Sequence, residues 1–227
     1  MKDLALHILD DDIGWLSRGR DRDPSGRLNA SASDFVDALN RKNQKWVEAT
    51  RQMSRPVVQG LLEWAGRQMD SYYADQSLTT PGRVAWASDD PVPNWFDIAQ
   101  DLTERWVHQM QMRDAIEKVG AYRDTYLGPV LDTFIWAVPH QYRVVADRGT
   151  TVLLDLGEGR VWTLTSDGTQ WHLSRGAEDV QPTAAVRADH HTGWRWLSGG
   201  VLNDGDLRTS GPEQLVKPLL SIRAILG

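Results

Sequence analysis

The sequence predicts a two-domain α+β fold, with an all-helical domain over residues 1–120 and a small α+β domain over residues 141–227. Apolar residues recur at helical spacing through most of the first part. Beyond about Gln141 they occur in short runs separated by turn residues, which is typical of strands. This change of pattern predicts the boundary, and residues 121–140 are expected to form a linker or an extra helix.

Three amphipathic segments open the helical part, and in each of them apolar side chains recur every three or four residues. They cover residues 3–17, 33–53 and 56–72. Ser33 and Asp34 are candidate caps of the second segment. Pro56 suits the first turn of the third, where a backbone N–H has no partner within the helix. We therefore expect three helices before residue 73.

A long loop and a fourth helix complete this part. Residues 74–93 are rich in Gly, Pro, Asp, Ser and Thr, which favours a loop, and a loop of this length is often functional. Asn94 is a good N-cap for a helix that continues to about Val119, and Gly120 is a plausible stop.

The C-terminal part alternates short strand-like runs with turns. The runs cover residues 142–147, 150–157, 160–174 and 183–189. Asp167 and Gly168 lie between two alternating runs and predict a hairpin. A last apolar helix is expected over residues 212–226, where Pro218 would kink it or mark its true first turn. Together these elements predict a small α+β domain.

Composition narrows the function. A net charge of −6 without a basic cluster argues against a nucleic-acid partner, and no apolar run is long enough to span a bilayer. The beginning of the sequence does not have the pattern of a secretory signal, so we expect a cytoplasmic protein without a membrane partner. Because the chain has no cysteine, any thiol chemistry must use a thiol from a cofactor.

Glu104 and His108 are candidate metal ligands. Four residues apart on a helix, they project about 40° from one another, which suits two ligands of one divalent ion such as Zn²⁺. An exposed Glu–His pair explains the same spacing without a metal. The pair also lies about 160° from Trp106 and the main apolar stripe, so a metal site requires this helix to be covered on two sides.

His7, in the first predicted helix, is the natural third ligand, although a lone histidine among apolar residues is more often a core or boundary residue. Asp11 lies one turn further along and is a candidate hydrogen-bond partner of its ring. The remaining histidines are interpreted as surface or loop residues: His140, His172, His190 and His191. Three arginines could hold an anionic thiol or substrate, although solvated or ion-paired roles suit them better: Arg20, Arg105 and Arg113.

Two segments carry a resemblance to a known family. "DLALHILDDDIGWLSRGRDRD" resembles the segment of DinB-like bundles that supplies a first histidine ligand, and "WFDIAQDLTERWVHQMQMRDAI" resembles the helix that supplies two more. A Glu and a His four apart are typical of the mycothiol-dependent maleylpyruvate isomerase branch. The segment from Val145 onwards resembles the sterol-carrier-like C-terminal domain of that branch.

The resemblance implies an N-terminal DinB-like four-helix bundle with a three-ligand metal site at His7, Glu104 and His108, followed by a small sterol-carrier-like α+β domain. Relatives usually carry a complete helix before the first histidine, whereas this sequence reaches His7 almost at once, so we expect that helix to be missing. Either the true start lies upstream, or a partner chain supplies the missing wall in a homodimer, or the site is more open than usual.

The leading functional hypothesis is a divalent-metal-dependent and mycothiol-dependent isomerase or S-transferase that acts on a small electrophile, with Zn²⁺ as the expected ion. Maleylpyruvate itself follows from the resemblance alone. A metal-dependent hydrolase, with water at the open coordination position, is the second hypothesis. A non-catalytic protein that binds a hydrophobic ligand is the third, and eleven tryptophans are compatible with it.

Overall fold

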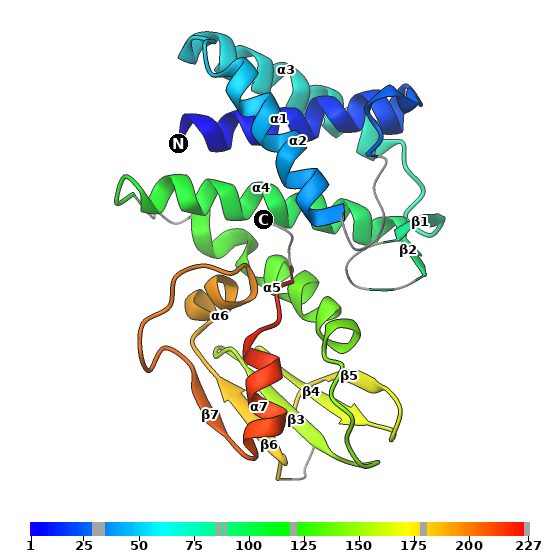
Figure 1. The fold of residues 1–227 in the computed structure, drawn as a ribbon, viewed down its shortest axis with the longest axis vertical. Helices are drawn as coiled ribbons and strands as arrows, with labels where there is room; N and C mark the ends of the chain where they lie inside the picture. Colours follow the sequence, from blue (N-terminus) through cyan, green and yellow to red (C-terminus); the bar gives the residue numbers. More distant parts are fainter. Residues whose placement is uncertain (29–34, 85–87, 89, 119–121, 178–180, 225–227) are drawn as a thin grey trace. The chain divides into compact units, whose positions relative to one another are not determined.

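The computed structural model of the chain describes residues 1–28, 35–84, 88, 90–118, 122–177 and 181–224 (Figure 1). These residues form helices and two sheets, as expected of an α+β protein. Two compact units divide the chain, one with residues 1–78 and 105–120 and the other with residues 79–104 and 121–227. The division falls within one helix, Asn94–Asp114, and the domain boundaries expected at residues 120 and 141 stay predictions.

The first unit is helical. Its elements are α1 (Lys2–Trp15), which continues into a π-helical turn, α2 (Phe35–Thr50), α3 (Arg55–Ala74) and the second half of α4 (Asn94–Asp114). These bounds confirm the predicted helices to within a few residues. The candidate caps Ser33 and Asp34 lie outside the described residues. Pro56 occupies the first turn of α3, after the N-cap Ser54.

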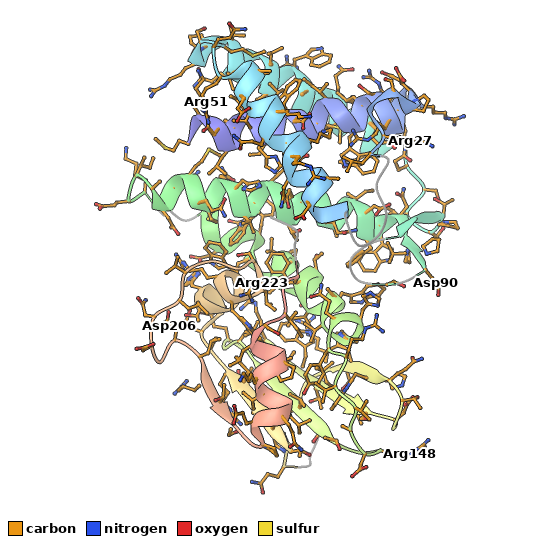
Figure 2. The ribbon with its side chains drawn as sticks, in the orientation of Figure 1. Arg27, Arg51, Asp90, Arg148, Asp206 and Arg223 are labelled. Carbon is orange, nitrogen blue, oxygen red and sulfur yellow. The ribbon has the colours of Figure 1, made fainter. Side chains whose placement is uncertain are left out.

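Helix α1 packs against α2 and α3 through a small apolar core. Leu6, Val47 and Val58 are buried there, and Trp46 Nε1 donates a hydrogen bond of 2.9 Å to the carbonyl of Leu6. The end of α2 is joined to the start of α1 by Arg51, labelled in Figure 2, which donates two hydrogen bonds to the Asp3 carboxylate. This packing fixes the position of α1, and with it the position of His7 next to the buried Leu6.

The predicted loop over residues 74–93 contains a short antiparallel pair, β1 (Pro81–Val84) and β2 (Pro91–Pro93), so the loop prediction was wrong for part of this segment. Proline-flanked strands of three or four residues have no readable alternation, which explains the error. Gly82 is required here, because a Cβ at this position would lie 2.5 Å from Asp97 Oδ2 and 3.0 Å from the Val92 carbonyl.

A five-stranded mixed sheet forms the centre of the second unit, in the order β5-β4-β3-β6-β7. Its strands are β3 (Thr151–Asp155), β4 (Val161–Ser166), β5 (Trp171–Arg175), β6 (Ala184–Arg187) and β7 (Arg208–Ser210). β3 pairs in parallel with β6, and the other pairs are antiparallel. The hairpin at Asp167 and Gly168 is confirmed, with Gly168 at φ +97°.

Besides the first half of α4, the described part of the second unit contains helices α5, α6 and α7. Residues 121–140, expected to be a linker or extra helix, lie almost entirely in α5 (Tyr122–Gln141), whose two internal prolines obscure its helical pattern. α6 (His190–Leu197) was not predicted. The last helix, α7 (Glu213–Leu220), is shorter than expected and packs against β6 (Figure 1).

The strand predicted over residues 142–147 does not form. Side chains of the sheet bind the backbone of this segment instead: Trp171 Nε1 donates to the Val144 carbonyl at 2.8 Å, and Ser166 Oγ donates to the Ala146 carbonyl at 3.0 Å. The alternating apolar residues of this segment therefore arise because side chains of the sheet hydrogen-bond its backbone, and the segment does not pair with a strand through backbone hydrogen bonds.

Tyr142 gives the second unit a measurable dependence on alkaline pH. Its side chain is 2% exposed, its hydroxyl donates a 2.6 Å hydrogen bond to the Leu215 carbonyl, and burial raises its pKa to about 12. Because the folded-state pKa is raised, the stabilisation is complete below about pH 10, the ordinary pKa of tyrosine, and is lost as the pH rises towards 12.

Replacing Tyr142 with phenylalanine should lower the free energy of unfolding by about 1 kcal/mol at pH 7, since one buried carbonyl loses its donor. The free energy of unfolding of the wild type should then fall by roughly 2 kcal/mol relative to Tyr142→Phe between pH 10 and 12, so that the variant becomes the more stable of the two. Urea denaturation across this range measures both effects. A difference that does not change with pH would contradict the assignment.

Among the residues that the structure describes, every helix is too short or too polar to cross a membrane.

Candidate metal centre

Helix α1 presents His7 at the border of its buried face. The neighbouring Leu6 and Leu9 are fully buried, while the His7 side chain is 17% exposed. The amphipathic pattern therefore anchors the helix through its leucines and leaves the imidazole accessible at one side. A half-buried imidazole of this kind is accessible to an ion that replaces the water around it.

Helix α4 carries Glu104 and His108 one turn apart. Trp106 is 2% exposed and His108 is 6% exposed, although they lie on opposite sides of the helix. The helix is thus covered on two sides. Such coverage was required for a metal site on the face that carries Glu104 and His108. Glu104 is half-buried. The boundary between the two units falls after Glu104 within this unbroken helix, so the helix itself sets Glu104 relative to His108.

His7 and His108 meet within the first unit. Their ring centroids are 4.8 Å apart, with the ring planes at 83°. One ligand atom from each of His7, Glu104 and His108 lies within 4.8 Å of those of the other two. All three predicted ligands are therefore brought together, although about a hundred residues separate the first from the others.

The donor set fits a divalent ion of the zinc type. Two imidazole nitrogens and one carboxylate oxygen form a catalytic zinc ligand set, which leaves a fourth position for water or substrate. Two ligand atoms each bonded to a tetrahedral ion at ~2.0–2.1 Å lie roughly 3.4 Å apart. Separations up to 4.8 Å thus require only small side-chain adjustments for a common ion to be bound.

Gln111 orients the His108 ring. Its Oε1 lies 2.8 Å from His108 Nδ1. An amide oxygen can only accept, so Nδ1 carries the proton and Nε2 keeps the lone pair that a metal needs. A hydrogen bond to the non-ligating nitrogen is the usual support of a metal-bound histidine. Sequence reasoning missed Gln111, although its position three residues after His108 on the same helix was a readable signal.

Two acidic residues beside His7 have different partners. Asp11 Oδ2 lies 3.6 Å from His7 Nε2, so the candidate partner lies beside the ring. Asp12 is 1% exposed and pairs with Arg105, whose Nη1 donates to Asp12 Oδ2 at 3.1 Å. Arg105 therefore joins α1 to α4 beside the metal ligands.

The other residues considered from the sequence have simpler roles. Arg20 pairs with Asp21 and donates to Gln68 on the surface. His140 lies close to Arg143, and the exposed His172 binds Asp167, whose pKa is held well below its usual range by that hydrogen bond first and by bonds from Gln170 and Thr169. The surface or loop interpretation was wrong for His190 and His191, which start helix α6 and are only 15% and 22% exposed.

Comparison with known proteins identifies a structural relative. The fold is similar to the crystal structure of the mycothiol-dependent maleylpyruvate isomerase, with a TM-score of 0.50 and 14% sequence identity over 92% of this chain and 76% of that chain. At this identity the likeness shows a shared fold. No family model matches the sequence, and no curated protein matches it either.

Proposed function

We propose that the protein is a divalent-metal-dependent and mycothiol-dependent isomerase or S-transferase acting on a small electrophilic substrate. The observation that carries the proposal is the meeting of His7, Glu104 and His108, with their ligand atoms within 4.8 Å of one another. The shared fold with a mycothiol-dependent isomerase supports it. We further infer that the helical unit corresponds to a DinB-like bundle and the C-terminal sheet to a sterol-carrier-like domain, and that Zn²⁺ is the preferred ion.

The chain's own residues would prepare the site for a thiol. His7 and His108 bind as neutral imidazoles and Glu104 as a carboxylate, so the ligand set carries one negative charge and a divalent ion would remain net positive. Gln111 holds the His108 ring in the required tautomer. A bound ion supplies the positive charge that favours the thiolate of mycothiol over its thiol.

The proposed isomerisation would proceed by addition of the thiol to the substrate and its later expulsion, without a net change in atoms. The thiolate sulfur adds to one carbon of a conjugated cis double bond and forms an S–C bond, while the displaced electron pair moves to the conjugated carbonyl. Rotation about the resulting single bond and expulsion of the sulfur restore the double bond in the trans form. For S-transfer, the thiol proton ends on the neighbouring carbon and the adduct leaves. The protein therefore needs to bind and orient both reactants.

The test is turnover of a maleylpyruvate-like electrophile by metal-loaded protein with and without mycothiol. We expect turnover only when both metal and thiol are present, and a loss of at least about tenfold in kcat/KM in Glu104→Gln, since the amide removes the ligand charge. The exposed variant His172→Ala is the matched control and should retain activity. Metal-dependent turnover without thiol would replace the proposal with a hydrolase. Substrate binding without any turnover would replace it with a binding protein.

A further inference from the structure

A second cluster of metal-binding side chains lies wholly within the second unit. One ligand atom from each of Asp124, His190 and His191 lies within 4.8 Å of those of the other two. They line a pocket of about 330 Å³ together with Leu127, Glu158 and Arg160. This cluster takes no part in the proposed function, and its residues are all different from the ligands of the first centre.

The start of α6 places the two imidazoles together. Asp189 caps the helix, accepting hydrogen bonds from the backbone N–H groups of His191 at 2.8 Å and Thr192 at 2.9 Å. The Thr192 hydroxyl donates a further hydrogen bond of 2.7 Å to the Asp189 carboxylate. The rings of His190 and His191 then lie with centroids 4.1 Å apart.

Carboxylates from two other elements face these rings. Asp124, in the first turn of α5, has its Oδ1 3.5 Å from His191 Nε2. Glu158, in the turn between β3 and β4, has its Oε1 3.6 Å from His190 Nδ1. Each imidazole therefore has a carboxylate beside it, from a segment distant in the sequence.

The turn that carries Glu158 has an unusual backbone. Gly157, Glu158 and Gly159 have φ of +74°, +50° and +75°, and a positive φ is rare for a residue with a side chain. A Cβ on Gly157 would come within 4 Å of the Ala188 carbonyl and the His190 nitrogen, so the turn lies against the start of α6. The fold thus holds Glu158 beside His190 in a backbone conformation that side-chain-bearing residues rarely adopt.

The distances between the facing atoms, 3.5 Å and 3.6 Å, suit ligands of a common ion. Ligand atoms on one tetrahedral ion lie roughly 3.4 Å apart, given bonds of ~2.0–2.1 Å. Two carboxylates beside two imidazoles also supply the negative charge that a dication requires.

We propose that Asp124, His190 and His191 form a binding site for a divalent transition-metal ion in the second unit, with Glu158 as an additional carboxylate at its edge. Two imidazoles and a carboxylate select Zn²⁺, Ni²⁺ or Cu²⁺ over Mg²⁺ and Ca²⁺, which prefer all-oxygen sites. The pocket leaves room for water or a small anion beside the ion, and Arg160, which donates to Glu158 at 3.1 Å, adds positive charge there.

The test uses the full chain with the first centre removed. In the Glu104→Gln/His108→Ala background, Co²⁺ titrated into chelator-treated protein should bind with a stoichiometry of one, followed by the visible absorption of bound Co²⁺. Adding His190→Ala/His191→Ala should weaken that binding at least about 100-fold, because two of three donors are lost. Mg²⁺ should not compete.

Two controls keep the outcome interpretable. Adding His140→Ala/His172→Ala to the same background removes as many histidines from outside the cluster and should leave Co²⁺ binding unchanged. Asp124→Asn keeps the size of the side chain and should weaken binding without disturbing the circular dichroism spectrum. No binding in the background protein, or equal binding after His190→Ala/His191→Ala, would overturn the proposal. A wild-type chain that binds a single Co²⁺ and loses it in His190→Ala/His191→Ala would contradict only the proposed function.

Discussion

Replacement of His108 with alanine is expected to weaken Zn²⁺ binding at the centre formed with His7 and Glu104 by at least about 100-fold. Loss of a residue that merely hydrogen-bonds a metal ligand costs ~10–100-fold in affinity, and loss of one of only three ligands costs more. Gln111→Ala should therefore give an intermediate effect, since it removes the 2.8 Å contact with His108 Nδ1 and leaves all ligands in place. Competition with a chromophoric chelator measures each affinity.

These measurements should be made in a His190→Ala/His191→Ala background, so that the second cluster does not contribute. Glu104→Gln provides a variant of nearly unchanged size, which separates loss of a ligand from the cavity left by truncating the buried His108. His172→Ala is the control with an unrelated histidine. Unchanged affinity in both His108→Ala and Glu104→Gln would remove the metal centre and with it the proposed reaction.

Replacement of Arg105 with leucine is expected to lower the free energy of unfolding of the metal-free protein by about 3 kcal/mol. Asp12 is 1% exposed and would be left as a buried charge without this guanidinium, which costs ~3–5 kcal/mol in fully buried pairs. The lower end applies because Arg105 is 30% exposed and water screens part of the interaction. Urea denaturation in the presence of a chelator gives the value.

The double variant Asp12→Leu/Arg105→Leu separates the charge from the packing. Replacing both members of a buried pair with apolar residues is often neutral, so most of the lost stability should return. Arg51→Leu is the matched surface control, because its pair with Asp3 is exposed to water and should contribute much less to stability. If Arg105→Leu were as stable as wild type, the ion pair with Arg105 would not be what compensates the buried charge of Asp12.

The helices of the first 120 residues were predictable because their signal is local. Apolar spacing indicated α1, α2, α3 and α4 to within a few residues. The Asp167–Gly168 hairpin was predictable for the same reason, since the turn needs a residue that tolerates positive φ. The strand predicted over residues 142–147 does not form. Any extended segment with one buried side alternates apolar and polar residues, whether or not its backbone pairs with a neighbouring strand.

Helices α5 and α6 show where local pattern is insufficient. Pro129 and Pro139 lie inside α5, and their local penalty hides a helix that tertiary packing sustains. In α6 the sequence "HHTGWRWL" is too short for a periodic signal, although Asp189 was a readable N-cap. As a result, His190 and His191 were interpreted as surface residues while they lie half-buried in a pocket.

The sequence by itself determined the helix that carries Glu104 and His108 and their common face, because a spacing of four residues is a property of one helix. The resemblance to a known family singled out His7 as their third partner, but only the tertiary structure shows that His7 meets them and that Asp124 meets His190 and His191. Those meetings depend on how separate helices and turns pack, and packing is governed by the shape of buried side chains from all the elements together, which no single segment encodes.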